Sequence, residues 1–194
     1  EHFMLKEIYE QPKTINDTIS PRIKNNDIVI EELNMSDEEI KEITKIHIVA
    51  CGSAYHTGVT AKYVIEGLAR IPVEVDVASE FRYRNPILQK GNMVIVISQS
   101  GETADTLAAL RESKEKGFKV LGIVNVVGSS IAREADSVMY TWAGPEIAVA
   151  TTKAYSAQLT ALYMLAMKFA KVRGTVDEEK FQSMLTDLRC LPDQ

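Results

Sequence analysis

Residues 98–103 read SQSGET and place three small hydroxyl side chains where the sequence changes its pattern. They follow a nearly continuous run of Val and Ile and precede a segment with apolar residues at helical spacing. A helix N-terminus presents unsatisfied N–H groups and a partial positive charge, so anions bind there readily. Ser98, Ser100 and Thr103 add hydroxyl donors, and Gly101, which has no Cβ, lets the backbone approach a ligand closely. We therefore predict that this turn binds a phosphate without the help of a lysine.

A simpler interpretation of the same turn stays open, in which Ser100 only caps the helix and the other hydroxyls are incidental. Thr106 is a further candidate donor at this point. The turn is neither a P-loop nor a dinucleotide fingerprint, because the sequence contains no Gly-Lys-Ser/Thr tripeptide and no G-x-G-x-x-G. Nucleoside triphosphates are therefore disfavoured as ligands.

Residues 51–56, which read CGSAYH, form a second strand-to-helix junction. Gly52 permits a tight turn, and Ser53 can donate to a ligand at the same edge. His56 has no visible partner and is interpreted as structural rather than as an acid or base. A nucleophilic pair of Cys51 and His56 is disfavoured, because Cys51 is expected to end a buried strand, whereas a reactive cysteine is exposed and has a lowered pKa.

Residues 144–153, which read GPEIAVATTK, form a third junction before a long helix. We expect Thr151 and Thr152 to face the same edge as the first two junctions. Lys153 could form a Schiff base with pyridoxal phosphate, but nothing else supports that cofactor, and a solvated lysine in a first helical turn is favoured. Residues 80–82, which read EFR, are interpreted as a structural ion-pair site, with contact to a ligand left open as the alternative. No metal-ligand spacing is present.

Short apolar runs alternate with amphipathic segments from residue 46 onward, which predicts βαβ units and a parallel sheet with helices on both sides. Ligands of such sheets bind beyond the carboxyl ends of the strands, where the three junctions lie. The predicted strands are residues 46–51, 73–77, 93–98, 120–125 and 137–142. The predicted helices are residues 58–70, 103–116 (ended by Gly117), 149–172 and 177–188.

The remaining sequence predicts an arm before the sheet and a linker after it. Residues 1–45 are read as a helical arm, with helices at 3–19, where Pro12 starts the second half, and at 36–44. Ser36 and Glu39 have the spacing of a capping box. The domain proper is placed at residues 46–173, and residues 174–194 as a C-terminal helix and linker.

The composition is that of a soluble globular protein, with 45% hydrophobic and 25% charged residues. The formal net charge is −5 and no stretch concentrates Lys and Arg, so nucleic acid and anionic membranes are disfavoured as partners. Cys51 and Cys190 are too few for a disulfide framework, which fits a reducing cytoplasm. No apolar run reaches the length of a membrane span.

Four segments resemble motifs of the glucosamine-6-phosphate synthase family, and the likeness runs over nearly the whole chain. They are residues 7–12 (EIYEQP), 80–84 (EFRYR), 98–106 (SQSGETADT) and 146–153 (EIAVATTK). The resemblance is to the first sugar isomerase (SIS) domain of the isomerase half. It implies an α/β fold, a three-layer αβα sandwich with a five-stranded parallel, flavodoxin-like sheet. Members convert fructose 6-phosphate and glutamine to glucosamine 6-phosphate and glutamate.

The resemblance also implies which residues bind the substrate. Those that would hold the sugar phosphate are Ser98, Gln99, Ser100 and Thr103. Those that would line the sugar or shape its turn are Gly52, Ser53, Val149 and Thr151. Ala54 departs from the family, which often has a second hydroxyl there, and a lost hydrogen bond of this kind costs on the order of 1 kcal/mol.

Catalytic residues are expected by resemblance in a second SIS domain, and a cysteine nucleophile in a glutaminase domain, neither of which lies in this chain. Since the chain does not begin with Met, we interpret it as a fragment that binds fructose 6-phosphate or glucosamine 6-phosphate without turnover. The resemblance implies a homodimer and neither pyridoxal phosphate nor metal. A non-catalytic SIS sensor, an interaction domain, and another SIS isomerase or deglycase stay open as alternatives.

Overall fold

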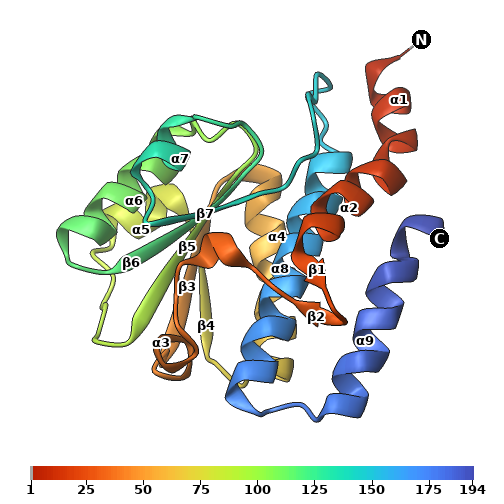
Figure 1. Ribbon diagram of the computed structural model, residues 1–194. Helices are drawn as coiled ribbons and strands as arrows, with labels where there is room; N and C mark the ends of the chain where they lie inside the picture. Colours follow the sequence, from red (N-terminus) through yellow and green to blue (C-terminus); the bar gives the residue numbers. More distant parts are fainter. Residues whose placement is uncertain (1) are drawn as a thin grey trace.

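A parallel sheet organises the computed structural model, which describes residues 2–194 (Figure 1). The five strands have the order β4-β3-β5-β6-β7, and each pair of neighbours is parallel. This is the 2-1-3-4-5 order of flavodoxin-like folds, which confirms the predicted fold class. In sheet order the strands are Val73–Val77 (β4), Lys45–Ala50 (β3), Asn92–Ser98 (β5), Lys119–Val124 (β6) and Ser137–Tyr140 (β7).

Helices cover both faces of the sheet, because alternate residues of each strand pack into one of two cores. On β3, Ile46 and Ile48 belong to the larger core, and Val49 belongs to the smaller one. Figure 1 shows α5, α6 and α7 on one side of the sheet and α4 and α8 on the other. These helices span Gly52–Leu68 (α4), Ala78–Tyr83 (α5), Ala104–Glu115 (α6), Ser130–Glu134 (α7) and Lys153–Arg173 (α8).

The segment before the sheet packs against the larger core as well as carrying its own short elements. Ile28 and Ile40 are fully buried in that core. The predicted capping box is confirmed, because the Glu39 N–H donates to Ser36 Oγ at 3.2 Å and the Ser36 N–H donates to Glu39 Oε2 at 2.8 Å. The elements are Phe3–Tyr9 (α1), Gln11–Ile19 (α2), Ser20–Arg22 (η1), Ile23–Lys24 (β1), Asp27–Ile28 (β2), Glu31–Leu33 (η2) and Asp37–Lys41 (α3).

Two boundaries follow from backbone conformation. Gly117 lies just after α6 at φ +83°, a left-handed conformation that ends the helix as predicted. Helix α8 begins at Lys153 and not near residue 149, and its N-cap Thr152 has a non-helical backbone with φ −132° and ψ −77°. The chain then continues through Glu178–Cys190 (α9) to Leu191–Asp193 (η3). In residues 2–194, no helix combines the length and apolar character that a membrane span requires.

Local sequence patterns did not predict α5, α7 or the β1–β2 hairpin. Each is short: α5 and α7 have 6 and 5 residues, and each strand of the hairpin has 2. Elements of this length carry too few residues to show a period of 3.6 or 2.

Candidate functional site

A pocket of about 300 Å³ lies at the carboxyl ends of β3 and β5. The strand order reverses between these two strands, which is where open α/β sheets bind ligands. The lining contains every predicted binding residue except Gly52. It consists of Cys51, Ser53, Ala54, Ile97, Ser98, Gln99, Ser100, Thr103, Glu146, Ala148, Val149, Thr151 and Gln158. We call it the carboxyl-end pocket.

Hydroxyl groups of the turn between β5 and α6 are partly used to build the turn itself. Ser98 Oγ accepts the Gly101 N–H at 3.0 Å and lies 2.9 Å from Thr103 Oγ1. Ser100 Oγ accepts the Glu102 N–H at 3.2 Å. The Ser98–Thr103 contact uses one of two hydroxyl protons, and Ser100 uses only a lone pair. One hydroxyl proton of the Ser98–Thr103 pair and the hydroxyl proton of Ser100 therefore remain to be donated to a ligand.

The first turn of α6 follows directly after Thr103, a residue of the pocket lining. The Leu107 N–H donates to the Thr103 carbonyl at 2.9 Å, and the three N–H groups that precede it in the helix have no intrahelical acceptor. Thr103 is the N-cap residue, and its side chain makes no capping bond. The alternative in which Ser100 caps this helix is therefore wrong, and the first turn keeps free N–H groups next to Thr103, which lines the pocket.

Gly101 is needed for a reason other than the predicted one. Its φ is +67°, and a Cβ at this position would lie 2.0 Å from Ser129 Oγ and 2.5 Å from Ser129 Cβ. The close neighbour is thus a protein side chain and not a ligand. Thr106 is also not a donor to the pocket, because it is buried and its Oγ1 lies 3.8 Å from Cys51 Sγ.

The junction after β3 matches its prediction in part. Gly52 has φ +57° and starts α4 outside the pocket lining, and Ser53 is exposed within the lining. Cys51 was expected to be buried at the end of a strand, but β3 ends at Ala50 and Cys51 lines the pocket half-buried. His56 is exposed and does not line the pocket.

The junction before α8 corrects the prediction for Lys153. This side chain is not solvated: the residue is 3% exposed, and its Nζ lies 2.5 Å from Glu10 Oε2. The prediction was wrong because Glu10 lies 143 positions earlier and left no local pattern. The Lys153 ammonium lowers the pKa of Glu10. Glu146 Oε2 accepts the Ala154 N–H at 2.8 Å, so a pocket carboxylate also caps α8.

Gln158 was not predicted as a pocket residue. It is a buried polar residue on α8 among buried alanines such as Ala154 and Ala157, and this interruption of an apolar face is the signal that could have identified it. Within residues 2–194, the buried Oε1 atom of Gln99 has no hydrogen-bond partner. A buried acceptor without a partner is costly, which favours a ligand hydroxyl or water at this point.

Comparison with known families decides what kind of domain carries this pocket. A family model described as the SIS domain matches residues 39–168. The chain belongs to the SIS domain family. The predicted family resemblance is thereby confirmed, and the matched residues include all three junctions that line the pocket.

The curated relatives of this SIS domain include long proteins. The glutamine–fructose-6-phosphate aminotransferase (isomerizing) of Clostridium tetani is 60% identical over 195 residues, which cover 100% of this chain and 32% of that protein. The protein of the same name from Caldanaerobacter subterraneus is 61% identical with the same coverage. This SIS domain therefore spans about a third of the length of these relatives.

Solved structures agree with this assignment. The C-terminal domain of glucosamine-fructose-6-phosphate aminotransferase from Francisella tularensis has a TM-score of 0.93 and 40% identity, covering 100% of this chain and 54% of that one. A glucosamine-6-phosphate deaminase from Thermotoga maritima has a TM-score of 0.72 and 24% identity, covering 95% and 53% of the two chains. At that identity the likeness concerns the fold.

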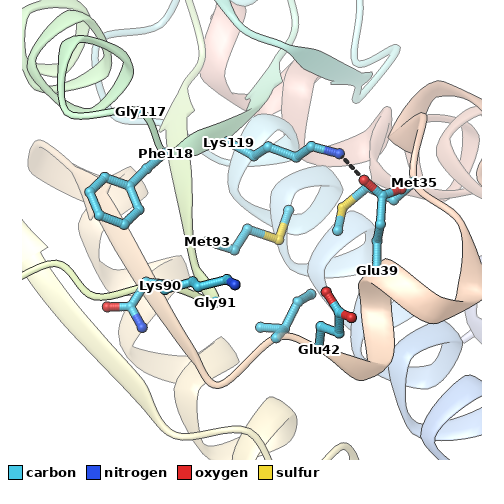
Figure 2. A pocket seen from close by; sticks show the side chains of 11 residues that line it. Met35, Glu39, Glu42, Lys90, Gly91, Met93, Gly117, Phe118 and Lys119 are labelled. Atoms are coloured by element: carbon cyan, nitrogen blue, oxygen red, sulfur yellow. Dashed lines mark hydrogen bonds and ion pairs between the residues drawn. The ribbon is translucent and has the colours of Figure 1, made fainter.

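A second pocket of about 250 Å³ lies at the opposite, amino ends of β5 and β6 in this SIS domain. Figure 2 shows the Lys119 ammonium directed at the Glu39 carboxylate across it. The lining consists of Met35, Glu39, Glu42, Ile43, Lys90, Gly91, Asn92, Met93, Gly117, Phe118 and Lys119. We call it the amino-end pocket.

One group of three metal-ligand residues lies together within residues 2–194, and its carboxylates are already paired. His47, Glu74 and Asp76 have ligand atoms within 4.8 Å of one another. Arg84 bonds Asp76 with Nε at 3.0 Å and Nη2 at 2.7 Å, and Lys45 Nζ lies 2.5 Å from Glu74. The Lys45 ammonium holds the pKa of Glu74 below its usual value. Both carboxylates of this group are therefore already paired with cationic side chains.

The predicted ion-pair site at residues 80–82 also proves structural. Arg82 Nη1 lies 2.5 Å from Asp105 Oδ1, which joins α5 to the first turn of α6. Neither residue lines the carboxyl-end pocket.

Proposed function

We propose that this SIS domain binds the phosphate of a sugar phosphate, fructose 6-phosphate or glucosamine 6-phosphate, in the carboxyl-end pocket. The observation that carries the proposal is the turn between β5 and α6. There, unsatisfied N–H groups of a helix N-terminus converge with the free hydroxyl protons of Ser100 and of the Ser98–Thr103 pair. These donors stabilise a dianion without a basic side chain.

The other side of the pocket suits the sugar. Ser53, Gln99 and Thr151 offer hydrogen-bonding groups, and Val149 offers an apolar surface, in the same lining. At 300 Å³ the space is at the lower end of small-molecule sites, which fits a single phosphorylated sugar. Ala54 presents a methyl group where a hydroxyl was expected by resemblance.

We further propose that the whole protein is a glutamine–fructose-6-phosphate aminotransferase that forms glucosamine 6-phosphate and glutamate. The identity of 60% over the full chain supports this reaction for the longer protein. We assign residues 46–173 to the sugar-phosphate-binding domain, residues 1–45 to the arm, and residues 174–194 to the connection toward a second SIS domain. The Francisella tularensis structure, of which the chain covers 54%, supports that plan.

We propose that the chain alone does not turn over its ligand. Isomerisation requires proton transfers by positioned acid and base groups. In the pocket lining, the titratable side chains are Cys51 and Glu146, and one Glu146 oxygen already accepts the Ala154 N–H. Incubation with fructose 6-phosphate and an ammonium salt, which supplies the nitrogen, followed by NMR, should show no glucose 6-phosphate or glucosamine 6-phosphate. Formation of either would contradict this part of the proposal.

Two further parts of the proposal concern assembly and compartment. We propose a cytoplasmic protein, since both cysteines are free, and a homodimer, as the family resemblance implies. Sedimentation equilibrium measures the assembly directly, and a monomer at micromolar concentration would contradict the dimer.

Calorimetric titration with fructose 6-phosphate, glucosamine 6-phosphate and unphosphorylated fructose tests the binding proposal. We expect binding of the two phosphorylated sugars and none of fructose. The double variant Ser100→Ala/Thr103→Ala should lose that binding, because it removes hydroxyl donors to the phosphate. The double variant Ser183→Ala/Thr186→Ala, on the surface of α9, is the matched control and should bind normally. A folded wild-type sample that binds no sugar phosphate would refute the proposal.

A further inference from the structure

The loop between β7 and α8 contributes a wall of the carboxyl-end pocket without having regular structure of its own. Ala148, Val149 and Thr151 line the pocket, and the residues from 143 to 152 form neither helix nor strand. Two of the loop's large side chains point to solvent, because Ile147 is 61% exposed and Val149 is fully exposed. Packing of these side chains therefore does not hold the backbone in place.

Asn125 bonds the start of the loop, because its Oδ1 accepts the Ala143 N–H at 2.7 Å and its Nδ2 donates to the Gly144 carbonyl at 2.8 Å. Glu7, on helix α1, bonds the loop further along, at the residues beside the pocket. The residue is 3% exposed, and its Oε1 accepts the Ile147 N–H at 2.6 Å across 140 positions of sequence. Oε1 also accepts the Ala148 N–H at 3.2 Å, and Oε2 lies 3.3 Å from the same nitrogen. Figure 1 shows this loop rising beside α1 and α2. One buried carboxylate thus binds two successive N–H groups of the pocket loop.

Neighbouring residues of the same arm fix the start of α8. Glu10 pairs with the buried Lys153, and Ser156 Oγ donates to Gln11 Oε1 at 2.5 Å. These contacts anchor the helix that follows the loop, whereas Glu7 anchors the loop itself. The two sets of contacts can be removed separately.

We propose that Glu7 is a positioning residue of the carboxyl-end pocket: it sets the loop that faces the sugar, while the turn at 98–103 holds the phosphate independently of it. The inference rests on the proposed function for the identity of the ligand. Hydrogen bonds to a charged acceptor are stronger than those between neutral groups, and two of them are enough to hold an irregular loop. A buried carboxylate also requires partners, so Glu7 and the loop fix each other.

Hydrogen exchange of the Ile147 and Ala148 amides tests the positioning without any ligand. In Glu7→Ala we expect exchange at least about tenfold faster than in wild type, because both N–H groups lose their acceptor. Glu7→Gln keeps an oxygen acceptor and should be intermediate. Asp17→Asn, which removes only a pair with Lys13 on α2, is the control and should leave both rates unchanged. Unchanged rates in Glu7→Ala would overturn the inference.

Titration with fructose 6-phosphate and with inorganic phosphate then tests the effect on the pocket. In Glu7→Ala we expect affinity for fructose 6-phosphate to fall about tenfold and affinity for phosphate to change less than about twofold, since one lost loop contact is at stake. An equal loss for both ligands would show a merely structural role and overturn the inference. If wild type binds neither ligand, the proposed function fails, and the exchange rates still decide whether Glu7 positions the loop.

Discussion

The two ends of one sheet carry pockets of similar size and opposite character. The carboxyl-end pocket, of about 300 Å³, has hydroxyl and amide side chains among its apolar residues, one carboxylate (Glu146), and neither lysine nor arginine. The amino-end pocket, of about 250 Å³, contains Lys90 and Lys119. A count of positive charges would place an anion at the amino end. The arrangement of backbone donors favours the carboxyl end, as proposed above.

The difference agrees with the direction of helix α6, because residues that flank its two ends line the two pockets. Its N-terminus follows Thr103 in the carboxyl-end pocket, and its C-terminus leads into Gly117 in the amino-end pocket. A helix carries about +0.5 charge at its N-terminus and about −0.5 at its C-terminus. In addition, Lys119 is paired with Glu39, and its ammonium lowers the pKa of that carboxyl. On the proposed assignment, chain direction matters more for anion binding in this domain than the number of lysines.

The largest expected effect is on ligand affinity at the carboxyl end. Ser100→Ala/Thr103→Val should weaken binding of fructose 6-phosphate by about 3–6 kcal/mol, since each lost bond to a charged group contributes about 1.5–3 kcal/mol. That corresponds to roughly two to four orders of magnitude in the dissociation constant. Calorimetry of the variant and of wild type measures the change.

The amino-end counterpart of that experiment is Lys90→Met/Lys119→Met. It removes two positive charges from the other pocket and should change the same affinity by less than about twofold at physiological salt, because charges beyond about 8 Å are screened. If the lysine variant loses binding and the hydroxyl variant does not, the assignment of the two pockets is reversed.

The second effect separates two glycines of the carboxyl end. Gly101→Ala adds a Cβ that meets Ser129 in a left-handed backbone, so we expect a loss of about 2–5 kcal/mol in the free energy of unfolding. Gly52→Ala meets the same backbone strain with no atom within 4 Å of the new Cβ, and should lose about 1–2 kcal/mol. Urea unfolding measures both. Equal losses would show that the contact with Ser129 relaxes at no cost.

The third effect is a pH dependence of stability that originates near the amino end. His47 on β3 is 1% exposed, and its Nε2 lies 3.3 Å from Oδ1 of Asn92, a residue of the amino-end pocket. Burial, with the charge of Lys45, lowers the pKa of His47, although Asn92, Glu74 and Asp76 act in the opposite direction.

Below about pH 6.5 His47 therefore binds a proton in the unfolded chain more readily than in the folded one, so acid favours unfolding. The free energy of unfolding should fall as the pH is lowered through about 6.5. The contribution of His47 to this fall should end below the pKa of His47 in the folded protein. In urea unfolding at about pH 7.5 and about pH 5.5, on either side of the unfolded pKa, we expect His47→Gln to lose most of this dependence. His56→Gln, at an exposed position on α4, should retain it. If both variants keep the pH dependence of stability, titratable groups other than His47 cause it.

The sequence was sufficient for the sheet and for the edge at which the pocket lies. The continuous Val and Ile of residues 94–97 predicted a strand covered on both faces, and β5 is fully buried. Parallel strands bring their carboxyl ends to one edge, so three separate junctions could be placed together before any contact was known. Periodicity and chain direction are local properties, and they can be read from local sequence.

Long-range contacts account for what the sequence did not predict. Lys153 was expected in solvent, but it is buried and pairs with Glu10. The bonds of Glu7 to the N–H groups of Ile147 and Ala148 were not predicted either. Gly101 was predicted to let a ligand approach the backbone, but the space that its Cβ would need is taken by the side chain of Ser129. Each partner lies in another element of the fold. A pattern of residue types within one segment contains no information about such a partner.

The smallest expected effect concerns the ion pair of the amino-end pocket. Lys119→Met removes the pair with Glu39, but both side chains are about half-exposed, so the free energy of unfolding should stay unchanged within error. The local electrostatics should change nonetheless. The Lys119 ammonium is the main cause of the lowered pKa of Glu39, and the Ser36 N–H is the next. NMR titration of the variant should therefore show this pKa raised toward its usual value, yet still below it. A clear loss of stability would mean that the amino-end pocket depends on its charges, as the carboxyl-end pocket does not.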